Sequence, residues 1–394
     1  MRHNLRHLRV FLAVVETGSV TRAAEICYVS QPAVTQAISK IEKTLGYALF
    51  TRSPHGLFVN DEGKLLFLRV RRAFSYLDPA LVELAPRLKV TATSAQLEAL
   101  VGVRELENFT LAARRLGVAQ PTIHRAVSQL EKEAARPLFE RTSYGMVATR
   151  LAQNLAQATR LAFAELHQAE ADLAEARAQE AGLIVVGGMP LSRSFILPSA
   201  IARFRRKRPK LPIKVVEGVY AELLGGLRRG EIDFLIGAMR NPLPIDDVEQ
   251  ETLFNDIVVI VAGKRHPLIG KPQICIGDLA SYPWVVATSG TPIRSHFDAL
   301  FQGQSQGPKS VVESSSLILM RELLDQSDHL GFVSGGQAAA EIKRGLMASL
   351  PFDLTHTERP IGITIRKGWL PTAAQAAFLD EIREEAKARQ THRL

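Results

Sequence analysis

The sequence predicts a multidomain protein with two small helical modules of one kind, a long linker helix and an α/β body. Three observations predict this fold: the N-terminal part repeats itself after 89 residues, a stretch without glycine or proline runs from Leu151 to Ala181, and short apolar segments alternate with helical patterns after Gly182. A chain of 394 residues is long enough for several domains. We expect head 1 at residues 1–90, head 2 at 91–150, the linker helix at 151–181 and the body at 182–394.

The two heads are copies of one module. Residues 8–58 align with residues 97–147 without a gap, and 17 of the 51 positions are identical. Each copy predicts a short helix, a tight turn and then a longer helix that begins at Gln31-Pro32 or at Gln120-Pro121. The longer helix has one apolar stripe and one polar face. This pattern is typical of a helix-turn-helix.

Head 1 contains the motifs Thr21-Arg22-Ala23-Ala24, Ser30-Gln31-Pro32-Ala33-Val34, Leu49-Phe50-Thr51-Arg52 and Asp61-Glu62-Gly63. With these motifs it resembles the winged helix-turn-helix domain of the LysR-type transcriptional regulators. Head 2 resembles a second copy, although Ala119 stands where head 1 has the helix-capping Ser30. The family pattern has one such head per chain, so the duplication is a departure from it.

The body resembles the effector-binding domain of the same family. The resemblance implies a two-lobed α/β fold like that of periplasmic binding proteins. Lobe one would take residues 182–257 plus 357–394, and lobe two residues 258–356. Candidate strands lie at residues 183–186, 213–216, 234–236, 257–261, 284–287 and 331–333.

The polar faces of the two longer helices carry the expected DNA contacts. Side chains that form paired hydrogen bonds read bases in the major groove, as glutamine reads adenine and arginine reads guanine. We hypothesise that the heads read different sequences, although head 2 could instead serve as a packing or dimerisation module. Arg52 and Arg141 would hold phosphates. The expected DNA-facing residues are Ser30, Gln31, Pro32, Thr35, Gln36, Ser39 and Arg52 in head 1, and Gln120, Pro121, His124, Arg125, Ser128 and Arg141 in head 2.

Charge supports a nucleic-acid partner for the heads. Residues 1–150 carry 21 Lys and Arg against 13 Asp and Glu, a net of +8, while the whole chain has a net charge of +9. A basic module on a near-neutral body favours binding of a polyanion. A rival interpretation is a nucleoid-type protein that binds DNA without regard to sequence, which would show strong salt dependence and no preferred site.

The linker helix carries an apolar seam. Leu151, Leu155, Ala158 and Ala162 begin a series that recurs every three or four residues, as in a coiled coil. The family resemblance implies that this seam pairs with the linker of a second subunit in a homodimer or homotetramer. The alternative is packing against the chain's own body. We expect the shorter equivalent helix of head 1 to end near Pro79 and Pro86.

Candidate ligand positions follow the strands of the body, because ligands of α/β folds gather at the carboxyl ends of strands. Arg193 or Arg294 would pair with a carboxylate, which agrees with the small organic or aromatic acids that the resemblance implies as effectors. For Ser192 and Thr291 the alternative is a role as helix caps only. The expected effector-binding residues are Pro190, Ser192, Arg193, Tyr220, Met239, Arg240, Thr288, Ser289, Gly290, Thr291, Arg294 and Ser334.

These features favour a sequence-specific transcriptional regulator over an enzyme. The sequence has no Gly-x-Ser-x-Gly, Cys-x-x-Cys, His-Glu-x-x-His or phosphate-loop motif, and we expect no cofactor and no metal. An enzyme on a binding-protein fold remains an alternative that would need a catalytic site. The expected partners are double-stranded DNA, a small-molecule effector and RNA polymerase. The two cysteines and the lack of a signal peptide or long apolar run predict a cytoplasmic protein away from membranes.

Overall fold

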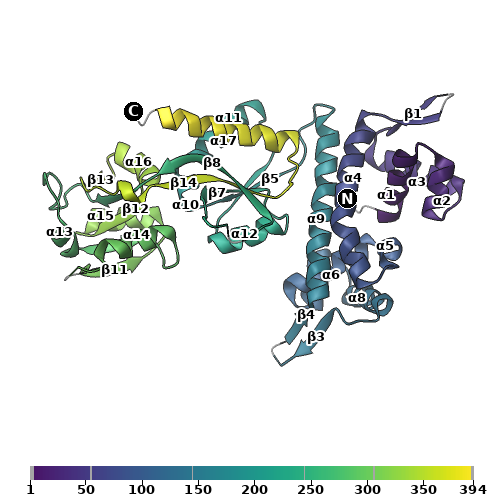
Figure 1. Ribbon diagram of the computed structural model, residues 1–394, viewed down its shortest axis with the longest axis horizontal. Coiled ribbons are helices and arrows are strands. Elements are labelled where there is room, and N and C mark those ends of the chain that lie inside the picture. The colour runs from purple at the N-terminus through teal and green to yellow at the C-terminus, as the bar shows by residue number, and fades with distance from the viewer. Residues whose placement is uncertain (1–3, 54–55, 144, 244, 305–306, 392–394) are drawn as a thin grey trace. The chain divides into compact units, whose positions relative to one another are not determined.

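The computed structural model describes residues 4–53, 56–143, 145–243, 245–304 and 307–391. The chain forms two compact units: the first extends to Gly182 and also includes Arg229–Glu231, and the second comprises the rest of the chain (Figure 1). We call the first the head unit, which contains both heads and the linker helix. The second is the body.

Head 1 is a helical domain with a two-stranded wing. Its elements are α1 (Leu5–Thr17), α2 (Val20–Cys27), α3 (Gln31–Leu45), β1 (Phe50–Ser53), β2 (Gly56–Val59) and α4 (Asp61–Leu84). The hydroxyl of Ser30 caps α3 by accepting a hydrogen bond from the Ala33 amide at 3.4 Å. Phe11, Val34 and Leu49 are fully buried in the core. Burial of this one side leaves the opposite face of α3 to solvent.

Head 2 repeats the same elements after the short helix α5 (Leu88–Thr91). They are α6 (Ser94–Leu106), α7 (Phe109–Leu116), α8 (Gln120–Ala134), β3 (Phe139–Thr142), β4 (Gly145–Ala148) and α9 (Arg150–Glu175). Val103, Ile123 and Val127 pack together in its core. The first turn of α8 lacks a side-chain cap, because Ala119 has no side-chain oxygen.

The cap difference predicts opposite effects of two substitutions. Ser30→Ala removes an acceptor from the first turn of α3 and should lower the free energy of unfolding by about 1 kcal/mol. Ala119→Ser supplies the missing acceptor to α8 and should raise it by about as much. Urea unfolding followed by circular dichroism measures both changes. Ala95→Ser, on an exposed position inside α6, is the matched control; a gain there as large as that of Ala119→Ser would contradict the capping account.

Helix α4 ends close to the second of the two prolines near which we expected it to end. It continues through Pro79 and ends at Leu84, two residues before Pro86. Pro79 is exposed, whereas Leu77 and Leu81 on either side of it are fully buried. Burial of this apolar face outweighs the backbone hydrogen bond that proline cannot donate.

The seam of α9 packs against α4 of the same chain. The two helices lie side by side and share one hydrophobic core (Figure 1). We expected the seam to meet a second subunit's linker or the chain's own body, and the structure instead gives it this partner inside the head unit. Helix α9 also ends at Glu175 rather than at residue 181.

Lobe one of the body is a five-stranded sheet in the order β6-β5-β7-β14-β8. The strands are β5 (Ile184–Gly188), β6 (Ile213–Val216), β7 (Phe234–Ala238), β8 (Val248–Asp256) and β14 (Arg359–Arg366), and the helices are α10 (Pro190–Ser194), α11 (Ile196–Lys207), α12 (Tyr220–Arg228) and α17 (Ala373–Thr391). Strands β5, β6 and β7 are parallel, and β14 returns antiparallel between β7 and β8. Phe204, Phe234 and Phe378 meet in the core between sheet and helices.

Lobe two has a sheet of the same size in the order β11-β10-β12-β9-β13. The strands are β9 (Val258–Ala262), β10 (Pro283–Val286), β11 (Ser310–Glu313), β12 (Leu330–Ser334) and β13 (Ala348–Ser349), and the helices are α13 (Ile276–Ala280), α14 (Pro292–Phe301), α15 (Leu317–Gln326), α16 (Gly335–Lys343) and the 3₁₀ turn η1 (Thr355–Thr357). Trp284 is buried at its centre, and its indole N–H donates to the Leu279 carbonyl at 3.0 Å. The six strands expected from the sequence are present, β6 with the expected ends and the other five with ends shifted by one or two residues, whereas β8, β11, β13 and β14 were missed.

A buried carboxyl group in lobe one makes stability depend on pH. Asp233 is 7% exposed and accepts a hydrogen bond from the Val185 amide at 2.8 Å. Burial raises the pKa of Asp233 to about 6, against the opposing effects of that hydrogen bond and of Arg366. Between these two pKa values the folded chain binds a proton at Asp233 that the unfolded chain has released. The stability that this proton contributes is fully present below the unfolded pKa of 3.8 and is lost as the pH rises through about 6.

Asp233→Asn should remove this pH dependence. The free energy of unfolding of the variant minus that of the wild type should rise by roughly 2.5 kcal/mol between about pH 4 and pH 7. Urea titrations of both proteins at each pH give this difference. The exposed Asp246→Asn is the control, and equal pH profiles for Asp233→Asn and the wild type would contradict the prediction.

Candidate functional site

The expected DNA-facing residues of head 1 lie on the exposed side of α3. Gln31, Thr35, Gln36 and Ser39 are exposed, while Val34 and the other apolar residues of the helix face the core. Pro32 is exposed in the first turn, and Ser30 is exposed but engaged in its cap. The side chain of Arg52, in the wing, lies outside the described part of the structure. The face that α3 offers to a partner is therefore polar and bears no carboxylate among these residues.

Helix α8 of head 2 offers a different surface at equivalent positions. Gln120, Pro121, His124 and Arg125 are exposed, as is Arg141 in β3, and Ser128 is half-buried. The ring of His124 stacks on Phe109 with 5.0 Å between ring centroids, and its Nδ1 lies 3.3 Å from the Ser128 hydroxyl. These contacts fix the imidazole in one orientation. Head 2 keeps exposed hydrogen-bonding groups where a degenerate copy would not need them.

The body contains a cavity of about 480 Å³ between its two lobes. It opens where strands of both sheets end and their connections turn into helices. Six of the expected effector-binding residues line it: Pro190, Arg193, Tyr220, Arg240, Thr288 and Thr291. The volume lies in the usual range for small-molecule sites.

The other six expected residues lie outside the cavity lining, because most of their polar groups serve the fold. Ser192 is fully buried and donates to the Met189 carbonyl at 2.8 Å, and Ser334 is fully buried as the cap of α16. Arg294 pairs with Asp298 and Glu313 on the surface of lobe two. The remaining three are Met239, Ser289, whose hydroxyl donates to Glu313, and Gly290.

Arg359 lines the cavity and was missed. Its side chain is only 11% exposed, and its Nη2 lies 3.4 Å from a carboxylate oxygen of Asp256. Its Nε and Nη1 are buried with no hydrogen-bond partner among the described residues. Burial lowers the pKa of Arg359, the charge of Asp256 opposes this effect, and the neighbouring Arg240 adds to it. The alternation of isoleucines after Arg359 was the signal that could have placed it at the start of a strand.

Two more residues of the cavity lining have a buried donor without a partner in the described part of the chain. Nε of Arg193 and the hydroxyl of Tyr220 are buried without a hydrogen-bond partner in the described structure. The other side of the Arg193 guanidinium pairs with Glu217, and the guanidinium of Arg240 lies 4.6 Å above the Tyr220 ring. Buried donors are nearly always hydrogen-bonded in folded proteins. Several unpaired donors on one wall indicate a place for an external acceptor.

Lobe two faces these groups with helix N-termini and hydroxyls. Thr291 caps α14 and donates to the Thr288 carbonyl, so it is both a cap and a lining residue. Ser316 caps α15 and lines the cavity with its neighbours Ser314 and Ser315. The N-termini of helices favour negative charge. The rest of the lining includes the polar Glu217, Glu222 and Gln337. Its apolar part includes Met189, Leu191, Ile293, Leu317, Met320, Phe332 and Val333.

The described residues contain no helix both long and apolar enough to cross a membrane. Residues 5–64 and 94–153 each match the family described as bacterial regulatory helix-turn-helix protein, lysR family, and residues 177–387 match the LysR substrate binding domain. The chain belongs to the LysR family of transcriptional regulators. As a member of this family, the regulator binds DNA, carries an effector-binding domain and is not an enzyme.

Known proteins agree with this assignment. The HTH-type transcriptional regulator GalR of Pseudomonas putida is 34% identical over 385 residues, which cover 97% of each chain. The solved structure of ArgP from Mycobacterium tuberculosis has a TM-score of 0.56 at 18% identity, and that of CbnR in complex with its target DNA has 0.51 at 22%. These two chains are covered to 96% and 98%, but they cover only 74% of this regulator. They therefore share its fold and leave about a quarter of it unmatched.

Proposed function

We propose that this LysR regulator reads DNA through α3 and α8 and that a small organic anion, held between the lobes of the body, controls this binding. The observation that carries the proposal is the guanidinium of Arg359, a residue that lines the cavity with Arg193 and Arg240 and has two buried nitrogens without a hydrogen-bond partner among the described residues. Leaving such donors unpaired is costly, so a ligand that accepts from them gains binding energy.

A carboxylate fits this wall of the cavity. The Nε and Nη1 atoms of Arg359 can each donate a hydrogen bond to a ligand oxygen, and a negatively charged oxygen accepts such bonds most strongly. The hydroxyl of Tyr220 and Nε of Arg193 supply donors for a further oxygen. The apolar side of the lining, which includes Leu191 and Phe332, suits a hydrocarbon or aromatic ring. The ligand class is therefore an organic or aromatic acid.

Control follows from contacts with both lobes. A ligand that binds both walls stabilises the arrangement in which the lobes lie closest together, and the population shifts toward it. We propose that this shift changes how the heads hold the operator. The proposal includes assembly into a homodimer or homotetramer, contact with RNA polymerase and a cytoplasmic location, where chromosomal DNA is found.

Matched ligand pairs test the effector class. Thermal unfolding of the full chain is measured with a panel of aromatic and aliphatic carboxylates, each paired with its uncharged primary amide. At least one acid should raise the unfolding temperature, and its amide should bind at least about 10-fold more weakly, since it lacks the charge that strengthens hydrogen bonds to arginine. Amides that bind as well as their acids, or a panel with no binding acid, would contradict the proposal.

A further inference from the structure

The two linker helices of this regulator are equivalent parts of the repeat, yet they pair with each other. Helix α4 begins at Asp61 and α9 at Arg150, 89 residues later, which is the same shift that aligns the heads. Their buried apolar residues belong to one core, including Leu77 and Leu81 of α4 and Leu166 and Leu173 of α9. A long apolar seam that would otherwise need a second chain is thus covered within one chain.

The pairing is antiparallel. Arg69, in the first half of α4, pairs with Asp172 near the end of α9 at 2.8 Å. Arg72 lies about one turn after Arg69, and its partner Glu165 lies about two turns before Asp172. Two equivalent helices that run antiparallel are related by an approximate twofold axis across them. The heads, which are attached to the N-terminal ends of these helices, therefore lie at opposite ends of the pair (Figure 1).

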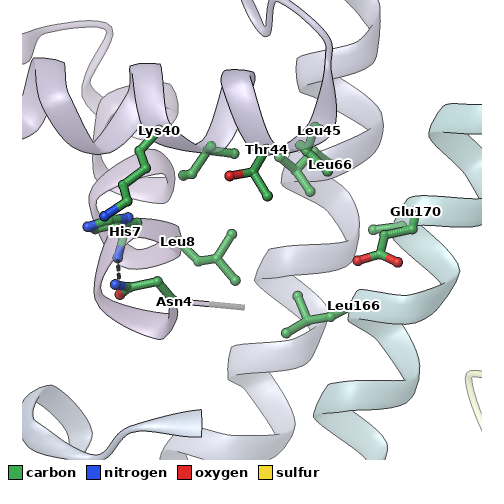
Figure 2. Close-up of a pocket in the computed structure, with 11 residues that line it drawn as sticks. Asn4, His7, Leu8, Lys40, Thr44, Leu45, Leu66, Leu166 and Glu170 are labelled. Atoms are coloured by element: carbon green, nitrogen blue, oxygen red, sulfur yellow. Dashed lines mark hydrogen bonds between the residues drawn. The ribbon is translucent and has the colours of Figure 1, made fainter. Parts of the chain in front are cut away.

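Head 1 also rests on the linker helix of head 2. A hollow of about 140 Å³ lies where α1 and α3 meet α4 and α9. Figure 2 shows Leu8 and Lys40 of head 1 around it together with Leu66 of α4, and Leu166 and Glu170 of α9. Head 1 is thus seated on both helices of the pair.

Buried charges select the pairing of α4 with α9. Arg69 and Glu165 are 2% and 5% exposed and are joined at 3.0 Å. The repeat places Ala158 and Leu161 at the positions of Arg69 and Arg72, and Tyr76 at the position of Glu165. If the α9 helices of two chains paired in the same way, Glu165 of each helix would face Ala158 and Leu161 of the other instead of two arginines. Because a buried charge without a partner is strongly destabilising, the sequence favours the unlike pair.

We infer that one chain of this regulator is a complete pair of DNA-reading heads and that it binds a single operator element made of two unlike half-sites. The inference rests on the proposed function, in which α3 and α8 read DNA. Thr35 and Gln36 of α3 correspond to His124 and Arg125 of α8, so the two half-sites differ in sequence. Helix α4 has 24 residues and is about 36 Å long, which separates the heads by about one turn of DNA or more.

A complementation experiment tests whether the paired heads belong to one chain. The full chain is made with Gln31, Thr35 and Gln36 changed to alanine, which silences head 1, and separately with His124 and Arg125 changed to alanine, which silences head 2. Each variant should bind a duplex with both half-sites at least about 100-fold more weakly than the wild type, since it loses the gain from linked modules. Each should still protect the half-site of its intact head, which shows that it is folded.

The two variants are then produced together in one cell and purified as a mixture. If α4 and α9 pair within each chain, no helix pair in the mixture carries two intact heads. The mixture should then show no component with wild-type affinity. The duplex carries one pair of half-sites, so a component with wild-type affinity would overturn the inference, because it requires heads from different chains to lie at the spacing that the α4–α9 pair sets. Failure of the proposed function looks different: the wild type would then protect no pair of half-sites, or the single variants would bind like the wild type.

Discussion

Arg359→Met is expected to weaken binding of the organic acid by about 100-fold or more and to leave DNA binding without ligand unchanged. The substitution keeps much of the side-chain volume but removes the two buried donors of this lining residue, which are unpaired among the described residues. Loss of a buried charged hydrogen-bond pair costs about 3 kcal/mol, which corresponds to that change in affinity. Isothermal titration of the full chain with the acid that binds the wild type measures the effect.

Two further variants separate the role of Arg359 from its charge and from general damage. Arg359→Lys keeps the charge but loses the two guanidinium donors, so its affinity should fall between those of the wild type and the Arg359→Met variant. Arg383→Met removes an arginine of the same body that pairs with Glu251 and Asp380 outside the cavity, and it should bind the acid like the wild type. Wild-type affinity in Arg359→Met would remove the basis of the proposed ligand site.

Glu165→Gln is expected to lower the free energy of unfolding by about 3 kcal/mol, because it leaves Arg69 and Arg72 with less neutralising charge in the core of the helix pair. Urea unfolding at neutral pH measures the loss. Glu83→Gln, an exposed substitution on α4 at the repeat position of Asp172, is the matched control and should change stability by less than about 0.5 kcal/mol.

An apolar replacement distinguishes a broken ion pair from a damaged helix. The double substitution Arg69→Met and Glu165→Met removes both buried charges together, and apolar pairs often replace buried ion pairs without loss. It should recover a large part of the stability that Glu165→Gln loses. If Glu165→Gln costs no more than Glu83→Gln, the ion pairs do not hold the helix pair together.

The sequence predicted the heads well because their information is local. Apolar spacing and the capping position at Ser30 define α3 from within a few residues, and the repeat then predicts α8. The partner of the α9 seam could not be predicted from local information. Periodicity shows that the seam needs an apolar partner but does not identify that partner. The acidic partners of the buried Arg69 lie 96 and 103 residues away in the sequence.

The cavity was predicted in part for a similar reason. Arg193 and Tyr220 follow parallel strands, whose carboxyl ends meet at one edge, so their place could be expected from chain order. Arg359 enters from the start of an antiparallel strand near the end of the chain, where that rule gives no guidance. Ser192 and Ser334 stand at the expected turns, but their hydroxyls serve the backbone around them.

The central claim is that both heads of one chain read sequence. Selection of binding sites from random duplex DNA at near-physiological salt tests it most directly, with the wild type, the Gln31/Thr35/Gln36 alanine variant and the His124/Arg125 alanine variant. We predict that the wild type selects a motif with two unlike halves and that each variant loses a different half. A motif unchanged in the His124/Arg125 variant would contradict the claim for head 2, and the absence of any motif with the wild type would contradict sequence-specific reading altogether.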